Sequence, residues 1–559
     1  MTRNIFLVCL GWLLLPHLTH AQPSSGSLLQ EIESQQSGRA LPDVIPKPLP
    51  GVPPIDSTQA KKYFVKSYKF VGNVQISEND LNVALKNYVN RSLSFNQLQA
   101  ATAAISELYR DRGWLVKAFL PSQDITEGTV AIHIIEARLG DVKIDNQSKR
   151  ISNEQLKSWV NKHIPKNTLL SLNHLDRLLL LINDLPGISI VGDLRAGTNP
   201  GETVLYVTVS DAPPVTGQVS VDNFGDPSTG TLRTTANVNV NGVLGFNEQV
   251  SLYGLYSDGS NYGRLSLAAP VGKDGLRLGV NGSFMTYRVV NPAFTDLHAS
   301  GEARTAGLES SYPIIRSRQS NLYVLGNYVS SNFYNMNVNG TTSQYQTNVF
   351  QIGASGNHID GFGNGAVSTG SMMMSSGRVN LNASPSQVYD EIGPQSEGGF
   401  TKLRYAFNRQ QAITRNLSLY GALSGQVANK NLDVSEQIYM GGPFNVRAYA
   451  LGQGASTQGN LTTLELRMSL SEKLLLSGFY DYANIQTYKT TGFDSAPENN
   501  FYALQGLGLN LSWSGPMNMQ IKATWARSTG SLPDTVQAYM DQNGGTSANR
   551  YWLTGAMPF

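Results

Sequence analysis

The sequence predicts a membrane-spanning antiparallel β-barrel at its C-terminal end, preceded by two smaller α+β domains. From residue 215 onward there is no convincing helix, and runs of about 10 residues alternate between apolar and polar side chains. Such alternation is typical of strands with one apolar face. The chain is rich in turn and strand residues, with 54 Gly and 25 Tyr, and only 15% of its residues are charged. With 559 residues it is also too long for one ordinary domain.

Residues 1–21 have the features of a secretory signal. Arg3 supplies a positive charge, residues 5–15 form a short apolar run, and residues 19–21 (Thr-His-Ala) make a cleavage site of the small-x-small type. The run is too short for a membrane helix, which needs about 20 residues, so we expect a mature chain that begins at Gln22. The only cysteine, Cys9, lies in this signal. We therefore expect neither disulfides nor thiolate chemistry in the mature chain.

Two segments separate this signal from the first folded domain. Residues 22–41 carry Leu28, Leu29 and Ile32 at helical spacing, which fits a short helix, but their Ser- and Gln-rich composition fits a disordered leader equally well. Residues 42–60 begin with a stretch that holds six prolines. Proline excludes a helix there and predicts an extended, semi-rigid linker.

Residues 61–138 predict a small domain with the element order β-α-α-β-β. A strand over 65–71 precedes a helix capped by Ser77. A second helix over 95–112 has apolar residues at every third or fourth position. Two strands follow, at 115–120 and 129–136.

Residues 139–212 repeat this order. A strand over 139–145 is followed by a helix that begins at Ser152 and by another that begins at Ser171 or Asn173. A hairpin then joins strands at 188–195 and 203–209. A repeat of about 75 residues with one element order indicates two copies of the same kind of domain.

Residues 213–559 fit either a soluble sandwich with an apolar core or a membrane barrel with an apolar outer face. The polar faces carry Gly, Asn, Ser and scattered Arg, as a water-filled lumen would, and the segment is long for one sandwich. A closed barrel also leaves no strand edge in lipid. The last strand places aromatic and apolar residues on one face: Tyr551, Leu553, Met557 and Phe559. A terminal strand that ends in Phe559 resembles the assembly signal of bacterial outer-membrane proteins, so we favour the barrel.

Four short segments carry a resemblance to a known family: residues 70–73 (FVGN), 221–225 (VDNFG), 441–449 (GGPFNVRAY) and 479–483 (FYDYA). Through them, essentially the whole mature chain resembles the two-partner secretion transporters, the ShlB/FhaC/HecB-like family. Residues 70–73 are similar to the end of the first strand in that family's periplasmic POTRA domains, and residues 221–225 to its opening barrel strand. Residues 441–449 (GGPFNVRAY) resemble the family's VRGY loop, and residues 479–483 (FYDYA) resemble its F-x-D-x-G strand motif. The resemblance implies a 16-stranded barrel, two POTRA domains and an N-terminal helix that can plug the pore.

The resemblance also implies a pair of interacting motifs. The pore loop, which folds back into the barrel, would present Val446, Arg447, Ala448 and Tyr449. The barrel wall would present Phe479, Asp481 and Ala483. Alanine replaces the family's glycine at 448 and at 483, which weakens any argument that needs a special backbone angle there.

The charges in these strands support the same arrangement on physical grounds. Phe479, Asp481 and Ala483 share one face of a strand. An arginine on the lipid face would cost about 2–4 kcal/mol near the midplane, so we expect Glu465, Arg467 and Asp481 to face the lumen. A lumenal Asp481 can hold Arg447 by a bidentate, charge-assisted pair that fixes the loop inside the pore. The alternative is that Arg447 is an ordinary solvated loop residue.

Signs of other functions are absent from the sequence. The seven histidines are scattered, and no HExxH, GxSxG or P-loop motif occurs. We therefore expect no enzymatic activity, no metal site and no cofactor. The formal net charge of +2 does not suggest a nucleic-acid partner.

The resemblance implies a transporter in the outer membrane of a Gram-negative bacterium, with its POTRA domains in the periplasm. It would bind an unfolded adhesin- or haemolysin-like exoprotein through that protein's N-terminal secretion domain and export it. Its other expected partners are outer-membrane lipid and the barrel assembly machinery. The alternatives are a BamA-like assembly factor, which commonly carries more POTRA domains, and a passive porin-type channel. The sequence leaves open the cargo, the strand boundaries, the client-binding POTRA edge, the role of residues 22–41 and the oligomeric state.

Overall fold

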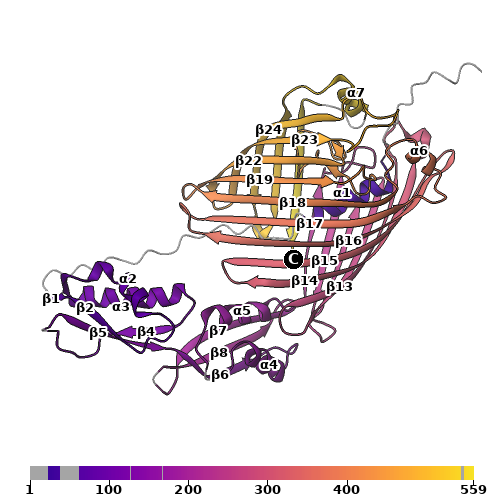
Figure 1. The fold of residues 1–559 in the computed structure, drawn as a ribbon. Helices are drawn as coiled ribbons and strands as arrows, with labels where there is room; N and C mark the ends of the chain where they lie inside the picture. Colours follow the sequence, from indigo (N-terminus) through magenta and orange to yellow (C-terminus); the bar gives the residue numbers. More distant parts are fainter. Residues whose placement is uncertain (1–22, 38–61, 126, 167, 200, 543–546) are drawn as a thin grey trace, which may run out of the picture.

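The computed structural model describes residues 23–37, 62–125, 127–166, 168–199, 201–542 and 547–559. The expected signal sequence and the proline-rich linker, residues 42–60, lie outside the described residues. Two small α+β domains lie beside one end of a large barrel, and helix α1 (Ser25–Ser37) lies within the barrel (Figure 1). We call the barrel end next to the small domains the near end and the opposite end the far end.

The first small domain is a three-stranded sheet covered by helices. Strand β5 lies between β2 and β4, parallel to β2 and antiparallel to β4. Helix α3 begins after Ser94, which forms a reciprocal capping box with Gln97, and its apolar face packs into the core through Leu98 and Ile105. Its elements are β1 (Lys62–Val65), β2 (Ser67–Val71), α2 (Glu78–Ala84), the 3-10 helix η1 (Lys86–Tyr88), β3 (Arg91–Ser94), α3 (Phe95–Asp111), β4 (Val116–Phe119) and β5 (Thr129–Glu136).

The single strand predicted over 65–71 is wrong in one respect, because the chain divides at Lys66. Strand β1 pairs with β3 in a separate two-stranded sheet, whereas β2 pairs with β5. The amide of Lys66 instead donates to the carbonyl of Gly128, at 2.7 Å. The apolar pattern runs through both strands and does not reveal that they have different partners.

The second small domain repeats this arrangement. Its sheet has the order β6-β8-β7, with β6 parallel to β8. Helix α5 begins after Ser171, whose hydroxyl accepts a hydrogen bond from the amide of His174. This decides between the two predicted starts, Ser171 and Asn173. The elements are β6 (Arg138–Asn146), α4 (Asn153–His163), α5 (Leu172–Asn183), β7 (Ile188–Ala196) and β8 (Glu202–Asp211).

Sixteen antiparallel strands close the barrel, which confirms the predicted fold class and strand number. The last strand, β26, pairs with the first, β9, so no edge is left open. The barrel strands are β9 (Val215–Asp222), β10 (Arg233–Asn241), β11 (Gln249–Tyr256), β12 (Ser260–Val271), β13 (Leu276–Arg288), β14 (Ser300–Arg316), β15 (Ser320–Asn337), β16 (Gly340–Asp360), β17 (Ala366–Asn380), β18 (Gly398–Ala412), β19 (Leu417–Ala428), β22 (Gln458–Ser471), β23 (Leu474–Gln486), β24 (Phe501–Ser514), β25 (Gln520–Ser528) and β26 (Asn549–Pro558).

The alternation of side chains places apolar residues outside and polar residues inside. In β24, Leu507, Leu509 and Leu511 are exposed on the outer face. Asn510 points into the lumen, where it bonds to Ser477 and Thr524 on the neighbouring strands. A sandwich would bury the leucines and expose the asparagine, so the structure confirms the barrel over the sandwich.

The prediction that no helix follows residue 215 is wrong in the far-end connections. Helices α6 (Gln387–Glu391) and α7 (Asp534–Gln542) and the 3-10 helix η2 (Thr295–Leu297) lie there, and the 3-10 helix η3 (Pro516–Asn518) lies in the near-end turn between β24 and β25. Elements of one to three turns are too short to establish a helical period in the sequence. Within the described residues, no helix combines the length and apolar character needed to cross a bilayer.

Polar contacts attach the second small domain to the near-end rim. Arg316, at the end of β14, donates two hydrogen bonds to the carboxylate of Asp184, at 2.7 and 2.8 Å. Arg177 on α5 donates to the carbonyl of Pro313 at 2.9 Å, and Lys162 on α4 lies 2.5 Å from Asp274. The orientation of this domain relative to the barrel therefore depends on a few directional contacts.

Replacing Asp184 by Ala is expected to loosen the second small domain while the barrel stays assembled. The substitution removes both hydrogen bonds from Arg316, and bonds to a charged group contribute about 1.5–3 kcal/mol. Electron-spin distance measurements between labels on the domain and on the rim should show a broader distribution. Asp193→Ala is the matched control, because Asp193 pairs with Arg195 within the same domain. Equal distributions for the two variants would show that Asp184 does not hold the domain.

Candidate functional site

A long connection between β19 and β22, residues 429–457, folds from the far end into the barrel. We call it the inward loop. It contains the short strands β20 (Ile438–Tyr439) and β21 (Ala455–Ser456), which pair with each other. The turns between them include Gly442, Gly452 and Gly454, all with positive φ, where glycine avoids the strain of a side chain. The loop therefore has a defined conformation.

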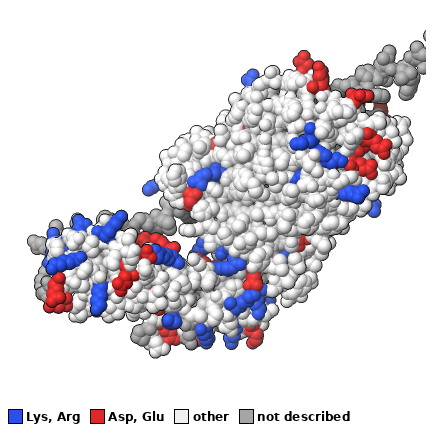
Figure 2. All heavy atoms as spheres, viewed as in Figure 1, with Lys and Arg blue, Asp and Glu red and all other residues white. Residues whose placement is uncertain are grey.

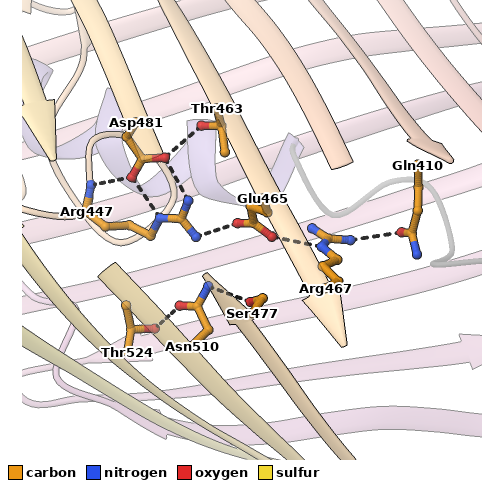
Figure 3. Close-up of polar contacts among 9 residues, drawn as sticks. All are labelled: Gln410, Arg447, Thr463, Glu465, Arg467, Ser477, Asp481, Asn510 and Thr524. Atoms are coloured by element: carbon orange, nitrogen blue, oxygen red, sulfur yellow. Dashed lines mark hydrogen bonds and ion pairs between the residues drawn. The ribbon is translucent and has the colours of Figure 1, made fainter. Parts of the chain in front are cut away.

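The structure brings Arg447 at the tip of the inward loop onto Asp481 of β23 (Figure 3). The Arg447 Nε and Nη2 donate to the two carboxylate oxygens, at 2.8 and 2.7 Å, and the Arg447 backbone amide donates at 3.2 Å. Thr463 on β22 donates to the same carboxylate, at 2.9 Å. Only 6% of the Arg447 side chain and none of the Asp481 side chain is exposed. Arg447 is therefore not a solvated loop residue.

A chain of charges extends this pair along the lumen wall. Arg447 Nη1 donates to Glu465 at 2.5 Å, and Arg467 donates to the other oxygen of Glu465 at 2.8 Å. Arg467 also donates to Gln410 of β18 at 2.9 Å (Figure 3). We call Arg447, Glu465, Arg467 and Asp481 the polar cluster. It balances two cations against two anions, as a buried charged group requires.

Aromatic residues complete the contacts of Arg447. Its guanidinium lies over the ring of Phe479, 3.4 Å from the centroid, which favours a flat cation over a compact one. The Trp552 indole of β26 donates to the Arg447 carbonyl at 2.7 Å. Phe224 meets the Trp552 ring edge-on at 5.8 Å. The loop tip thus contacts both β23 and the strand that closes the barrel.

Sequence reasoning missed Trp552, Thr463 and Gln410. Trp552 could have been found, because it alternates with the outward-facing Tyr551 and Leu553 and so must point inward. Nothing in the sequence singles out Thr463 or Gln410. The barrel register sets Thr463 beside Asp481, and it brings Gln410 within hydrogen-bond distance of Arg467.

The two alanines that replace the family's glycine fit without strain. Neither Ala448 nor Ala483 has a positive φ, and both are buried in an apolar cluster with Val446, Tyr449 and Phe479. Space around them is limited instead. A Cβ placed on Gly506 of β24 would lie 2.6 Å from the Cβ of Ala448, which is too close for two carbon atoms. The loop therefore sits against bare backbone at Gly506.

Replacing Ala448 by Val is expected to displace the loop tip and lower its function, whereas Ala448→Gly is expected to be tolerated. Added volume in a packed site typically costs about 1–3 kcal/mol, and the rigid backbone at Gly506 cannot yield. The measurement is the export activity that the sequence predicts, in variants whose barrel has assembled, with Ala448→Gly as the control. Wild-type activity for Ala448→Val would show that the contact with Gly506 does not constrain the loop.

Helix α1 also lies in the lumen. Its apolar residues Leu28, Leu29 and Ile32 are buried in a cluster with lumen-facing residues of the wall. Glu33 accepts hydrogen bonds from Tyr262, at 3.1 Å, and from Arg264, at 3.3 Å. Residues 25–37 thus form the helix that one of the two sequence interpretations predicted.

Phe559 lies at the seam of the barrel. Its amide and carbonyl both bond to Gly217 of β9, at 2.9 Å, and its side chain is 58% exposed. It faces outward with Tyr551, Leu553 and Met557. In the part of the chain that the structure describes, no group of three or more His, Cys, Asp or Glu is placed to hold a metal ion.

Comparison with known proteins matches the sequence of this chain to secretion proteins. The family model of the haemolysin secretion/activation proteins ShlB/FhaC/HecB matches residues 201–527, and that of the ShlB-type POTRA domain matches residues 63–137. The heme/hemopexin transporter protein HuxB of Haemophilus influenzae is 27% identical over 526 residues, which cover 90% of this chain and 91% of HuxB.

Solved structures share the fold. CdiB from Escherichia coli aligns with a TM-score of 0.67 at 19% identity and covers 96% of this chain and 100% of that structure. BamA from Haemophilus ducreyi lacking POTRA domains 1–3 aligns with a TM-score of 0.52 at 16% identity, covering 89% of this chain and 100% of that structure. At these identities the likeness concerns the fold alone.

Proposed function

Since the chain belongs to the haemolysin secretion/activation protein family ShlB/FhaC/HecB, we propose that it exports a partner exoprotein across the outer membrane by two-partner secretion. The near end then faces the periplasm, where the two POTRA domains lie, and the far end faces the cell exterior. The POTRA domains bind the unfolded partner through its N-terminal secretion domain. The partner then passes through the barrel lumen to the outside.

The observation that carries this proposal is a lumen occupied by two elements that are held with different strength. The Glu33–Arg264 pair of α1 is partly hydrated, with 30% and 26% of the two side chains exposed, and such pairs contribute about 0–1 kcal/mol. The Arg447–Asp481 pair is buried, and breaking a buried pair costs about 3–5 kcal/mol. Release of α1 must also expose the buried Leu28, Leu29 and Ile32. The inward loop, in contrast, is joined to barrel strands at both of its ends, so α1 can leave the lumen and open a path beside a loop that stays attached.

The drive for export comes from the partner. The chain carries no nucleotide-binding motif, and we propose that it has no catalytic activity. An unfolded chain that folds outside cannot slide back, so folding of the partner makes each step irreversible. The partner belongs to the class of adhesin- or haemolysin-like exoproteins.

Two other functions fit parts of the structure less well. An assembly factor of the BamA type shares the fold, but a lumen filled by α1 and the inward loop suits a gated path for a client. A passive porin has no use for two periplasmic binding domains. Export accounts for the periplasmic domains and for the occupied lumen together.

Deletion of the gene tests the proposal. The proteins of the culture medium and of the outer membrane are quantified in the deletion strain and in the strain complemented with the wild type. We expect one large exoprotein to disappear from the medium while other barrel proteins keep their abundance. A general fall in barrel proteins would instead identify an assembly factor, and an unchanged medium would rule out export.

A further inference from the structure

A polar groove opens on the outer wall of the barrel near its exterior end. A hollow of about 480 Å³ is lined there by Glu302, Arg304, Asn332, Gln344, Gln346 and Asn380. We call it the outer groove. Charged side chains are nearly absent from the barrel wall visible between its two ends, and they gather again at the end that carries α6 (Figure 2). The groove therefore belongs to the polar end of the wall, where charged side chains return.

The strand register places the groove residues in one row. Arg304 of β14 pairs with Asn332 of β15, Asn332 with Gln346 of β16, and Gln346 with Asn380 of β17. Four polar side chains thus lie side by side across four neighbouring strands. Arg378 lies two residues from Asn380 along β17, on the same face of the strand.

This row is on the outside of the barrel. Leu308 and Phe350 occupy the same strand faces as Arg304 and Gln346, and they are 57% and 54% exposed. The intervening Ala303 and Thr305 of β14 are buried toward the lumen. The next outer-face row toward the periplasm is Ala306, Ser330, Asn348 and Arg378, and the apolar row that includes Leu308 and Phe350 follows it. The groove therefore lies one row beyond the apolar part of the wall.

Arg304 is oriented by two neighbouring side chains and stays accessible. Its Nη2 lies 2.9 Å from the Glu302 carboxylate, and its guanidinium lies over the Phe284 ring, 5.6 Å from the centroid. Yet 66% of its side chain stays exposed. An arginine costs about 2–4 kcal/mol at the bilayer midplane but about 0–1 kcal/mol near the interface, so this height suits a cation that meets headgroups.

The chemistry of the groove matches a phosphorylated glycolipid. Guanidinium groups bind phosphate through paired hydrogen bonds. Asn and Gln side chains both donate and accept, as recognition of sugar hydroxyls requires. The apolar rows below offer a surface for acyl chains. Arg304 and Arg378 are three strand spacings apart across the wall, about 14 Å at about 4.8 Å per strand, and two residues apart along it, about 7 Å, so their backbones are roughly 16 Å apart. Two long side chains on such a span can meet a headgroup with two phosphates.

We propose that the outer groove binds the bisphosphorylated disaccharide headgroup of the outer-leaflet glycolipid, lipid A. The proposal depends on the outer-membrane location and not on export. Helix α1 contacts β14 and β15 from inside the barrel. Bound lipid A would therefore attach the same part of the wall, strands β14–β17, to the outer leaflet from outside.

Native mass spectrometry of the full-length protein in detergent tests this proposal. The probes are bisphosphorylated lipid A, dephosphorylated lipid A and phosphatidylglycerol, and the variant is Arg304→Gln with Arg378→Gln. We expect the wild type to retain bisphosphorylated lipid A, the double variant to bind it at least ten-fold more weakly, and the other two lipids to bind weakly to both. Arg527→Gln is the matched control, because Arg527 is an exposed outward-facing arginine near the exterior end of β25.

Two other outcomes would contradict the proposed lipid A site. Equal binding of phosphatidylglycerol would mean unspecific attraction of anionic lipid, and unchanged binding by the double variant would overturn the site. Heat-modifiable migration on gels reports whether the barrel assembles. If the double variant fails that check, Arg304→Gln alone is used, and wild-type binding by it would likewise overturn the proposal.

Discussion

Replacing Arg447 by Ala is expected to lower export of the partner protein at least ten-fold while the barrel still assembles. The substitution leaves Asp481 with only its bonds from Thr463 and from the backbone amide of residue 447, and it removes one of the two arginines that neutralise Glu465. An uncompensated buried charge costs about 3–5 kcal/mol, whereas about 1.4 kcal/mol already shifts an equilibrium ten-fold. The inward loop should therefore leave its place on the wall for most of the time.

Secreted partner protein is measured in the medium, and heat-modifiable migration shows that the barrel is assembled. Arg447→Lys should recover only part of the activity, because an ammonium cannot make a bidentate pair and stack over Phe479 as a guanidinium does. Arg527→Ala, which removes an exposed arginine of β25, is the control and should secrete normally. Wild-type secretion by Arg447→Ala would show that the pairing with Asp481 is not needed for export.

Deleting residues 25–37 is expected to raise the ion conductance of the barrel several-fold. An α-helix with its side chains is about 10–12 Å across, so its removal leaves a wide, polar space that water fills. Conductance is recorded in planar bilayers at constant voltage. Unchanged conductance after the deletion would mean that α1 does not obstruct the lumen.

A point substitution separates the position of α1 from its presence. A Cβ on Gly26 would lie 2.5 Å from the Tyr345 hydroxyl and 2.9 Å from the Cβ of Ser435. Gly26→Leu should therefore dislodge the helix and raise conductance as the deletion does. Ser34→Leu is the matched control, because Ser34 is exposed on the same helix. Equal conductance for the two variants would contradict the placement of α1.

Much of the fold follows from the sequence because strand alternation is local. Leu507, Leu509 and Leu511 show which face of their strand meets lipid without any knowledge of the neighbouring strands. The charges of Arg467 and Asp481 require an inside by the same reasoning, since lipid would not solvate them. The sequence does not decide whether residues 25–37 form a helix, because a weakly apolar, polar-rich segment becomes a stable helix only where a surface covers its apolar side.

Local alternation alone therefore predicts a barrel with polar residues inside, and the residue pattern identifies the motifs around Arg447 and Asp481. The fold in three dimensions is needed to show which side chains meet across the lumen and which outward polar residues line up in the outer groove. The physical reason is the register between strands. A slip of one residue would reverse the face of every side chain, and the closure of sixteen strands sets that register through hydrogen bonds between segments that are far apart in the chain.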